Sequence, residues 1–455
     1  MEFVTGRKNG KSILLDVFEK KETKRVPWVP FAGVHAGKLL NHDANEILND
    51  SRKLYESLLE VKKIYEPDGM PVVFDLQLEA EVLGCELQWD KKSPPTVRTP
   101  PLLEKKIPSK IPEPTEGRYP IVLETMEKLK SSIGDEVALF GLICGPFTLA
   151  SHLRGTQFFM DLIEDRSYSE QLLKYTSDVV KRIIEFYVDA DMDVIAVVDP
   201  LVSQISPRHF RQHLKSPFKE IFDYIRDKNT FSAFFVCGDA SKNIEPMCET
   251  LPDAVFVDEN VDIVEAKKIT SSKKIIIGGN IPLTTTMLYG TQMDNMKYVV
   301  DLIDSVGKMD FILAPGCDMP YDTPPENVVA AGQAAKQIGD ARDILKNYKS
   351  EATLIDIKLP DYEKLEKPLI EVFTIDSSTC AACTYMYNTA MLAKEKFGDS
   401  VDVVEYKSTT PEGIARVRKL NIEKLPSILI NGQLAFSSII PDQKKLFKRI
   451  EDVLR

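Results

Sequence analysis

The chain has 455 residues, of which 43% are hydrophobic and 28% are charged. This composition supports a full hydrophobic core, so it excludes a disordered, collagen-like or disulfide-framework protein. The 69 acidic residues outnumber the 58 basic ones and no long basic run occurs, which argues against nucleic acid as a partner. We find neither an apolar leader nor a segment long enough to cross a bilayer, and therefore expect a cytoplasmic protein without a membrane partner.

Short apolar runs recur along the first 320 residues and alternate with segments of helical periodicity. The runs span 27–33, 70–76, 138–146, 194–200, 231–237, 254–259, 274–280 and 310–317. Continuous apolar runs are typical of strands that are buried on both faces of a parallel sheet. Eight strand–helix units predict an α/β fold, a (β/α)8 TIM barrel, within residues 1–345.

A proline-rich stretch interrupts the second of these units. Residues 90–118 contain seven prolines, which exclude a helix there. We expect an ordered excursion that covers one end of the barrel.

The pattern changes after a linker over residues 346–368. From residue 369 the expected order is strand 369–374, a Cys-x-x-Cys motif, helix 383–396, strand 401–406, helix 410–420, strands 427–430 and 434–437, and helix 441–454. This order predicts a small thioredoxin-like domain over residues 369–455, with Leu425 and Pro426 before its third strand.

Cys380 and Cys383 form the motif that opens the first helix of this domain. Unpaired N–H groups and the helix dipole favour the thiolate of the first cysteine, which makes it the attacking sulfur. Cys383 then resolves the mixed disulfide. A structural zinc knuckle is the alternative interpretation of this spacing.

In a barrel of this kind the side chains at the carboxyl ends of the strands converge on the active site. The residues found there are His35, Asp75, Gln77, Glu79, Glu81, Cys144, Asp199, Cys237, Asp258, Glu259, Asn280 and Cys317. His42, His152, His209 and His213 lie on or beside expected helices, and we assign them no role.

Cys237 and Cys317 stand out because each adjoins a glycine where a strand opens into its loop. Two thiolates with one further ligand suit a catalytic Zn²⁺ ion that keeps one position open. The third ligand stays open among six residues: His35, Asp75, Glu79, Glu81, Cys144 and Asp199. Asp199 is equally suited to accepting backbone N–H bonds within a loop.

Three segments resemble the uroporphyrinogen decarboxylase superfamily over about residues 20–340. They are Ala80-Glu81-Val82-Leu83-Gly84, Gly145-Pro146-Phe147-Thr148-Leu149-Ala150 and Thr323-Pro324-Pro325-Glu326-Asn327-Val328. The resemblance implies a (β/α)8 barrel with one of two activities. One branch decarboxylates a tetrapyrrole, and the other, the zinc-dependent corrinoid methyltransferases, moves a methyl group between a corrinoid cobalt and a thiol.

Several positions separate the two branches. Decarboxylases carry an arginine-rich segment after the first strand, whereas residues 30–37 here contain no arginine. Asp75 matches their pyrrole-binding aspartate, but their Gly-His near the last strand is Gly316-Cys317 here. Cys237 and Cys317 match the two cysteine ligands of the methyltransferases, while Phe235 occupies the position of their histidine ligand.

The resemblance therefore favours a corrinoid-dependent methyltransferase with a fused thiol–disulfide domain. It implies methylcobalamin or a protein-bound corrinoid as methyl donor, a small thiol or folate-type acceptor, and Zn²⁺ on Cys237, Cys317 and Glu81, with Glu79 or His35 as alternative ligands. We predict catalytic roles for Asp75, Cys380 and Cys383, and cofactor binding by three residues: His35, Asp199 and Asn280. The alternatives are a tetrapyrrole decarboxylase and a redox-controlled tetrapyrrole- or corrinoid-binding module.

Overall fold

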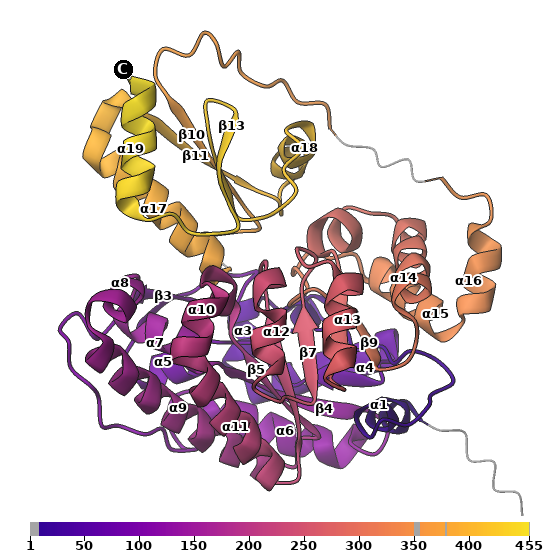
Figure 1. The fold of residues 1–455 in the computed structure, drawn as a ribbon. Coiled ribbons are helices and arrows are strands. Elements are labelled where there is room, and N and C mark those ends of the chain that lie inside the picture. Colours follow the sequence, from indigo (N-terminus) through magenta and orange to yellow (C-terminus); the bar gives the residue numbers. More distant parts are fainter. Residues whose placement is uncertain (1–8, 350–354, 378–379, 455) are drawn as a thin grey trace, which may run out of the picture.

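The computed structural model describes residues 9–349, 355–377 and 380–454, which form two α/β units (Figure 1). Seven parallel strands make the sheet of the larger unit, in the order β1-β4-β5-β6-β7-β8-β9. Their bounds are β1 Gly69–Pro71, β4 Ala138–Cys144, β5 Val194–Val198, β6 Phe231–Val236, β7 Ala254–Val257, β8 Ile276–Ile281 and β9 Phe311–Pro315. Each coincides with one of the apolar runs, so seven of the eight expected strands are confirmed.

The expected first strand is reduced to a single parallel bridge between Trp28 and Leu313. The Trp28 carbonyl also accepts a hydrogen bond from the Asp68 N–H at 2.9 Å, so this segment lies between β9 and β1 and links the two edges of the sheet. A longer ladder does not form because Pro27 and Pro30 have no N–H to donate.

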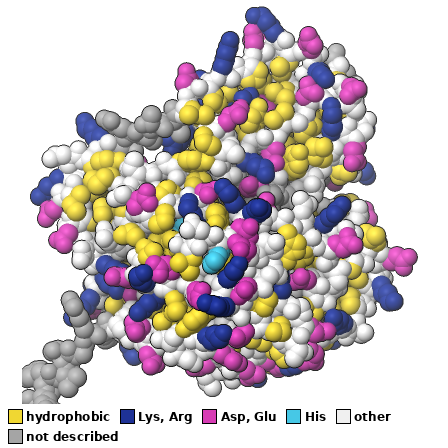
Figure 2. Space-filling view, turned by 180° about the vertical axis from the view of Figure 1, so that it is seen from behind, with side chains coloured by type: hydrophobic (Ala, Val, Ile, Leu, Met, Phe, Trp, Pro, Cys, Tyr) yellow, Lys and Arg dark blue, Asp and Glu magenta, His cyan; other side chains and the backbone are white. Residues whose placement is uncertain are grey.

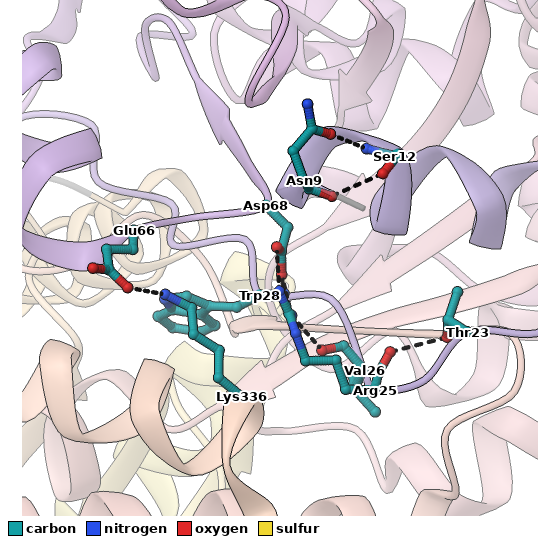
Figure 3. Close-up of polar contacts among 9 residues, drawn as sticks. All are labelled: Asn9, Ser12, Thr23, Arg25, Val26, Trp28, Glu66, Asp68 and Lys336. Atoms are coloured by element: carbon teal, nitrogen blue, oxygen red, sulfur yellow. Dashed lines mark hydrogen bonds and ion pairs between the residues drawn. The ribbon is translucent and has the colours of Figure 1, made fainter. Parts of the chain in front are cut away.

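Asp68 fixes this segment in place (Figure 3). Its carboxylate binds both terminal nitrogens of the Arg25 guanidinium, at 2.6 and 2.7 Å, and accepts the Trp28 N–H at 2.7 Å. The ion pair and the Trp28 hydrogen bond hold this segment beside β1, where a ladder of backbone hydrogen bonds does not form.

Helices follow the strands around the sheet. They are α1 Gly10–Phe18, α2 His35–Lys38, α3 Ala44–Leu48, α4 Ser51–Tyr65, α5 Leu78–Val82, α6 Tyr119–Ile133, α7 Pro146–Arg154, α8 Gln157–Glu164, α9 Arg166–Asp189, η1 Pro200–Gln204, α10 Pro207–His209, η2 Phe210–Leu214, α11 Lys215–Asp227, η3 Ser241–Asn243, α12 Ile244–Cys248, α13 Ile263–Ser272, η4 Leu283–Leu288, α14 Gln292–Val306, α15 Pro325–Lys336 and α16 Ile338–Leu345. The proline-rich excursion contains β3 Thr96–Thr99, which pairs with β2 Glu86–Gln88, and residues 100–117 contain no helix, as expected.

Aromatic side chains fill the interior of the barrel. Phe31, Phe74, Phe140, Phe235 and Phe256 pack together there, and the Phe31 and Phe235 ring centroids are 4.9 Å apart. Free space is therefore left beyond the carboxyl ends of the strands.

The smaller unit has a four-stranded sheet in the order β11-β10-β12-β13. Its elements are β10 Leu369–Thr374, α17 Ala381–Phe397, η5 Gly398–Ser400, β11 Asp402–Lys407, α18 Pro411–Lys419, β12 Ser427–Ile430, β13 Gln433–Ser437 and α19 Gln443–Leu454. β10 and β11 are parallel, whereas β12 and β13 each run antiparallel to their neighbour. Among the residues described in both units, no helix combines the length and apolar character needed to span a membrane.

Candidate functional site

A cavity of about 430 Å³ lies where the barrel mouth meets the smaller unit. Its barrel wall includes Cys237, Asp258, Cys317 and Asp318, which follow β6, β7 and β9. The excursion contributes Asp90 and Lys92, and the smaller unit contributes Asp376, Cys380 and Pro426. The cavity is thus shared by both units.

Several contacts hold the smaller unit over the barrel mouth. Lys424 forms an ion pair with Asp239 at 2.5 Å, and the Leu425 N–H donates to the Asn260 side chain at 3.2 Å. Gln204 donates to the Ser438 carbonyl and accepts from the Ile440 N–H, both at 3.0 Å. Figure 2 shows acidic and basic side chains interspersed over both lobes on the face that it presents.

Cys237 and Cys317 meet at the cavity as a disulfide, with their Cα atoms 6.0 Å apart. Each follows the end of its strand, and both side chains are partly exposed to the cavity. The fold therefore brings together the two cysteines that sequence analysis paired, although they are bonded to each other.

The described residues do not fit the predicted Zn²⁺ site. They contain no group of three His, Cys, Asp or Glu side chains placed to hold a metal ion. The Phe235 ring, at the position of the family's histidine, packs inside the barrel against Phe31. Glu81 is paired with Arg118 and is not among the residues that line the cavity with the two cysteines, so the structure gives its assignment as a ligand no support.

Arg118 organises the carboxylates that follow β1. It binds Asp75 at 2.5 Å and Glu81 at 2.7 Å, and its guanidinium lies 4.9 Å from the centre of the Trp89 ring. Asp75 is buried in this pair and is not among the residues that line the cavity. The network ties the end of the excursion to the barrel, and the structure gives the catalytic role predicted for Asp75 no support.

Glu79 lies beside this network and is buried. Burial raises the pKa of its carboxyl to about 8, with the neighbouring Asp75 charge acting in the same direction. Glu79 is therefore largely neutral at pH 7.

The three residues predicted to bind the cofactor form hydrogen bonds with other parts of the protein. His35 has its ring nitrogens 2.6 Å from the Tyr65 hydroxyl and 3.0 Å from the Tyr321 carbonyl, and burial lowers its pKa to about 4. Asp199 accepts the Phe147 N–H at 2.9 Å and the Thr148 hydroxyl at 2.6 Å. The Asn280 amide donates to two carbonyls. None of the three lines the cavity, so the structure does not support direct cofactor contact by them.

Sequence analysis gave no site role to several cavity residues, among them Asp318 and His152. Asp318 accepts the Gly33 N–H at 2.7 Å, and burial raises its pKa to about 8. His152 on α7 also lines the cavity, and burial lowers its pKa to about 4. The Gly316-Cys317-Asp318 sequence carried a signal for Asp318, whereas nothing in the sequence told which face of α7 meets the cavity.

The cavity is acidic. Asp90, Asp258, Asp318, Asp322 and Asp376 line it, whereas Lys92 is the only Lys or Arg among the described residues that do so. Lys92 itself is paired with Asp322 at 2.6 Å. A ligand with several carboxylates would therefore find no free cation on this wall.

Cys380 occupies the N-cap position of α17, where its sulfur accepts the Cys383 N–H at 3.3 Å. Its side chain is partly exposed and lines the cavity, whereas Cys383 is fully buried. Burial raises the pKa of the Cys383 thiol well above its ordinary value. The two cysteines of the motif thus differ in access, as the attacking and resolving roles require.

The fold is a barrel with its cavity at the carboxyl ends of the strands. Residues 9–338 match the family of uroporphyrinogen decarboxylase (URO-D), and the chain belongs to this family. The match ends before the smaller unit begins.

Relatives with known names match more than half of the chain. The chain is 28% identical over 275 residues to the methylcobamide:CoM methyltransferase MtbA of Methanosarcina acetivorans, covering 59% of this chain and 79% of the relative. It is 23% identical over 295 residues to the uroporphyrinogen decarboxylase of Nostoc punctiforme, covering 63% and 82%. A solved methyltransferase from Methanosarcina mazei superposes with a TM-score of 0.66 at 23% identity, over 73% of this chain and 99% of that one, which shows a shared fold.

Proposed function

We propose that this protein transfers a methyl group from a methylated corrinoid to a small thiol at the cavity. The observation that carries the proposal is the pair Cys237 and Cys317 at the carboxyl ends of β6 and β9, where the methyltransferase branch has its cysteines. The named methyltransferase relatives are 28% and 29% identical to the chain over 275 and 276 residues. Zn²⁺ is not part of the proposed reaction, because the described residues contain no group of three ligand side chains placed to hold the ion.

The charge of the cavity supports methyl transfer over tetrapyrrole decarboxylation. Of the five aspartates on this wall, Asp322 is paired with Lys92 and Asp376 with Lys407, and burial raises the pKa of Asp318 to about 8. A porphyrinogen with several carboxylates would therefore meet no unpaired lysine among the described residues that line the cavity. Binding several carboxylates requires cations to pair with them, and the described residues that line the cavity include no arginine. An acceptor without several negative charges fits this wall better.

The size of the cavity supports a small acceptor. Its 430 Å³ lies at the lower end of the range for pockets that hold small molecules, about 300 to 1,000 Å³. A whole corrin ring needs more room, so a free or protein-bound methylcobamide reaches the cavity only when the smaller unit moves away from the mouth.

We propose that Asp318, which lines the cavity, takes the proton from the acceptor thiol. A free thiol has a pKa of about 8.5. Burial raises the pKa of Asp318 to about 8, so the two values are close. Matched pKa values suit proton transfer from the thiol to the carboxylate. The acceptor thiolate then attacks the methyl carbon, a carbon–sulfur bond forms, and the electron pair of the cobalt–carbon bond stays on cobalt.

We further propose that residues 369–455 form a thioredoxin-like thiol–disulfide domain. The sheet order, the parallel pairing of β10 with β11 and the position of Cys380 at the start of α17 support this assignment. The free thiols of Cys85, Cys144 and Cys248 support action in the reducing cytoplasm.

The test is an optical assay of methylcobalamin with coenzyme M and the reduced protein. We expect demethylation of the corrinoid and formation of the methylated thiol, with at least tenfold slower turnover in Asp318→Asn, since one positioned acid–base group contributes about 10² to 10⁴ in rate. Cys248→Ala alters a buried cysteine outside the cavity and serves as the control. Decarboxylation of uroporphyrinogen without methyl transfer would overturn the proposal.

A further inference from the structure

We propose that the Cys380/Cys383 dithiol reduces the Cys237–Cys317 disulfide by thiol–disulfide exchange inside the shared cavity. The inference goes beyond methyl transfer and does not rest on it, because it concerns the chemistry of the four sulfur atoms alone. In this proposal the substrate of the smaller unit is the Cys237–Cys317 disulfide of the same chain.

The first support is placement. Cys237, Cys317 and Cys380 all line one cavity of about 430 Å³, although they come from the ends of β6 and β9 and the start of α17. Pro426, which precedes β12 in the smaller unit, lines the same space. Attack on a disulfide requires access to it, and here the attacking thiol and the disulfide line one cavity.

The second support is the state of the four cysteines. Cys380 and Cys383 are free thiols, whereas Cys237 and Cys317 are bonded. The disulfide and the first thiol of the dithiol therefore line the same cavity, and an exchange between the two pairs needs no other reactant.

The third support is selectivity. The other cysteines, Cys85, Cys144 and Cys248, are buried and do not line the cavity. Cys383 is buried behind Cys380, so an intermediate at Cys380 has one resolving thiol next to it. Contacts such as Lys424 with Asp239 keep the two units together while the exchange proceeds.

The step balances within the chain. The Cys380 thiolate attacks one sulfur of the Cys237–Cys317 bond, which breaks and leaves a mixed disulfide and one barrel thiolate. Cys383 gives up its proton and attacks the Cys380 sulfur, which forms the Cys380–Cys383 disulfide and releases the second barrel thiolate. Two electrons have moved to the barrel pair, the proton given up by Cys383 can protonate one of the two barrel thiolates, and an external dithiol can restore Cys380 and Cys383.

The first test compares the full-length protein with its Cys380→Ser variant, each carrying the barrel disulfide. A limiting amount of dithiothreitol is added, and alkylation followed by mass spectrometry measures how fast Cys237 and Cys317 become free. We expect reduction at least about tenfold faster in the wild type, because a tethered thiol acts at millimolar effective concentration. Cys248→Ser is the matched control and should behave as the wild type. Equal rates in the wild type and the Cys380→Ser variant would overturn the proposal.

A second test measures proximity and does not depend on the wild-type barrel disulfide. In the Cys317→Ser/Cys383→Ser double variant only Cys237 and Cys380 remain at the cavity, and diamide should join them within one chain. The Cys317→Ser/Cys380→Ser variant keeps the buried Cys383 and should form no such bond. A third variant, Cys237→Ser/Cys383→Ser, tests the Cys317–Cys380 bond in the same way. If neither the Cys237–Cys380 bond nor the Cys317–Cys380 bond forms, the result would contradict the shared cavity.

Discussion

The two cysteine pairs at the cavity differ in what brings their cysteines together. Cys380 and Cys383 are three residues apart on one helix, so local backbone geometry alone sets their distance. Cys237 and Cys317 are 80 residues apart, and they meet only because the barrel brings the ends of β6 and β9 together. The local pair therefore keeps its geometry wherever α17 forms, whereas the barrel pair depends on the closed barrel.

The buried ion pairs, in contrast, are alike in the two units, because each joins residues that are distant in the sequence. The barrel buries Asp75 against Arg118, and the smaller unit buries Glu371 against Arg416 at 2.8 Å. Arg118 also joins the excursion to the barrel through Glu81 and Trp89. The barrel mouth is thus maintained by contacts between distant segments, which a single change can break.

The oxidised barrel pair should hold no Zn²⁺ tightly, and this is the largest effect expected. We expect the oxidised protein, incubated with Zn²⁺ and desalted, to keep less than about a tenth of an equivalent per chain, because thiolate ligands are required and the sulfurs are bonded to each other. Elemental analysis measures the content. One tightly held Zn²⁺ per chain, lost in Cys237→Ala, would show that the pair is a metal site after all.

Removing either buried arginine should destabilise the unit that contains it. Arg118→Met leaves Asp75 as an unpaired buried charge, and Arg416→Met does the same for Glu371, each at a cost of about 3 to 5 kcal/mol. Hydrogen exchange with mass spectrometry should locate the first loss in the barrel and the second in the smaller unit. The Asp75→Asn/Arg118→Met double variant should recover part of the loss; a loss below about 1 kcal/mol in Arg118→Met would contradict the role of the network.

The buried Glu79 should make the barrel less stable as the pH rises. Its pKa is about 8 in the folded protein against an ordinary 4.5, so between these values the folded state holds the extra proton. Stability is therefore lost as the pH rises from about 5 to about 8, by up to about 4 kcal/mol for this group. Glu79→Gln should flatten the dependence of Tm on pH, whereas Glu86→Gln, at an exposed position, should not. Parallel curves for wild type and Glu79→Gln would exclude a raised pKa.

The smallest effect is expected at the contact between the units. Lys424→Met removes a partly exposed ion pair with Asp239, which is worth no more than about 1 kcal/mol. We expect an unchanged Tm but faster alkylation of Cys380 by iodoacetamide, because the cavity opens more often. Lys419→Met, which removes an exposed pair with Asp356, is the control. Slower or unchanged alkylation in Lys424→Met would show that this pair does not hold the cavity closed.

The sequence predicts most of the fold because the relevant patterns are local. Apolar runs located seven strands, and the Cys-x-x-Cys motif located the start of α17. The helical segment over 43–66 is divided into α3 and α4, since the Asp50 side chain accepts the Arg52 and Lys53 N–H groups and starts a new helix. The prolines that limit the first strand to a bridge were visible, but their effect on the ladder was not inferred.

The site was predictable only in part because its remaining contacts are long-range. The strand-end rule brought Cys237 and Cys317 together, but it does not distinguish side chains that face the cavity from those, such as Asp199, that hold a neighbouring loop. Arg118 pairs with a carboxylate 43 residues away. The placement of Cys380 at the barrel mouth depends on contacts such as the one between Lys424 and Asp239, 185 residues apart, which no local pattern encodes.

Methyl transfer measured as a function of the redox state of Cys237 and Cys317 tests the central claim most directly. Protein poised in dithiothreitol buffers is mixed with methylcobalamin and coenzyme M, and the methylated thiol is quantified beside the fraction of free Cys237. Because the cavity is both the transfer site and the location of the disulfide, we predict that product formation rises with that fraction and falls away in fully oxidised protein. Equal methyl transfer by the oxidised and reduced forms, or none by either, would contradict the account.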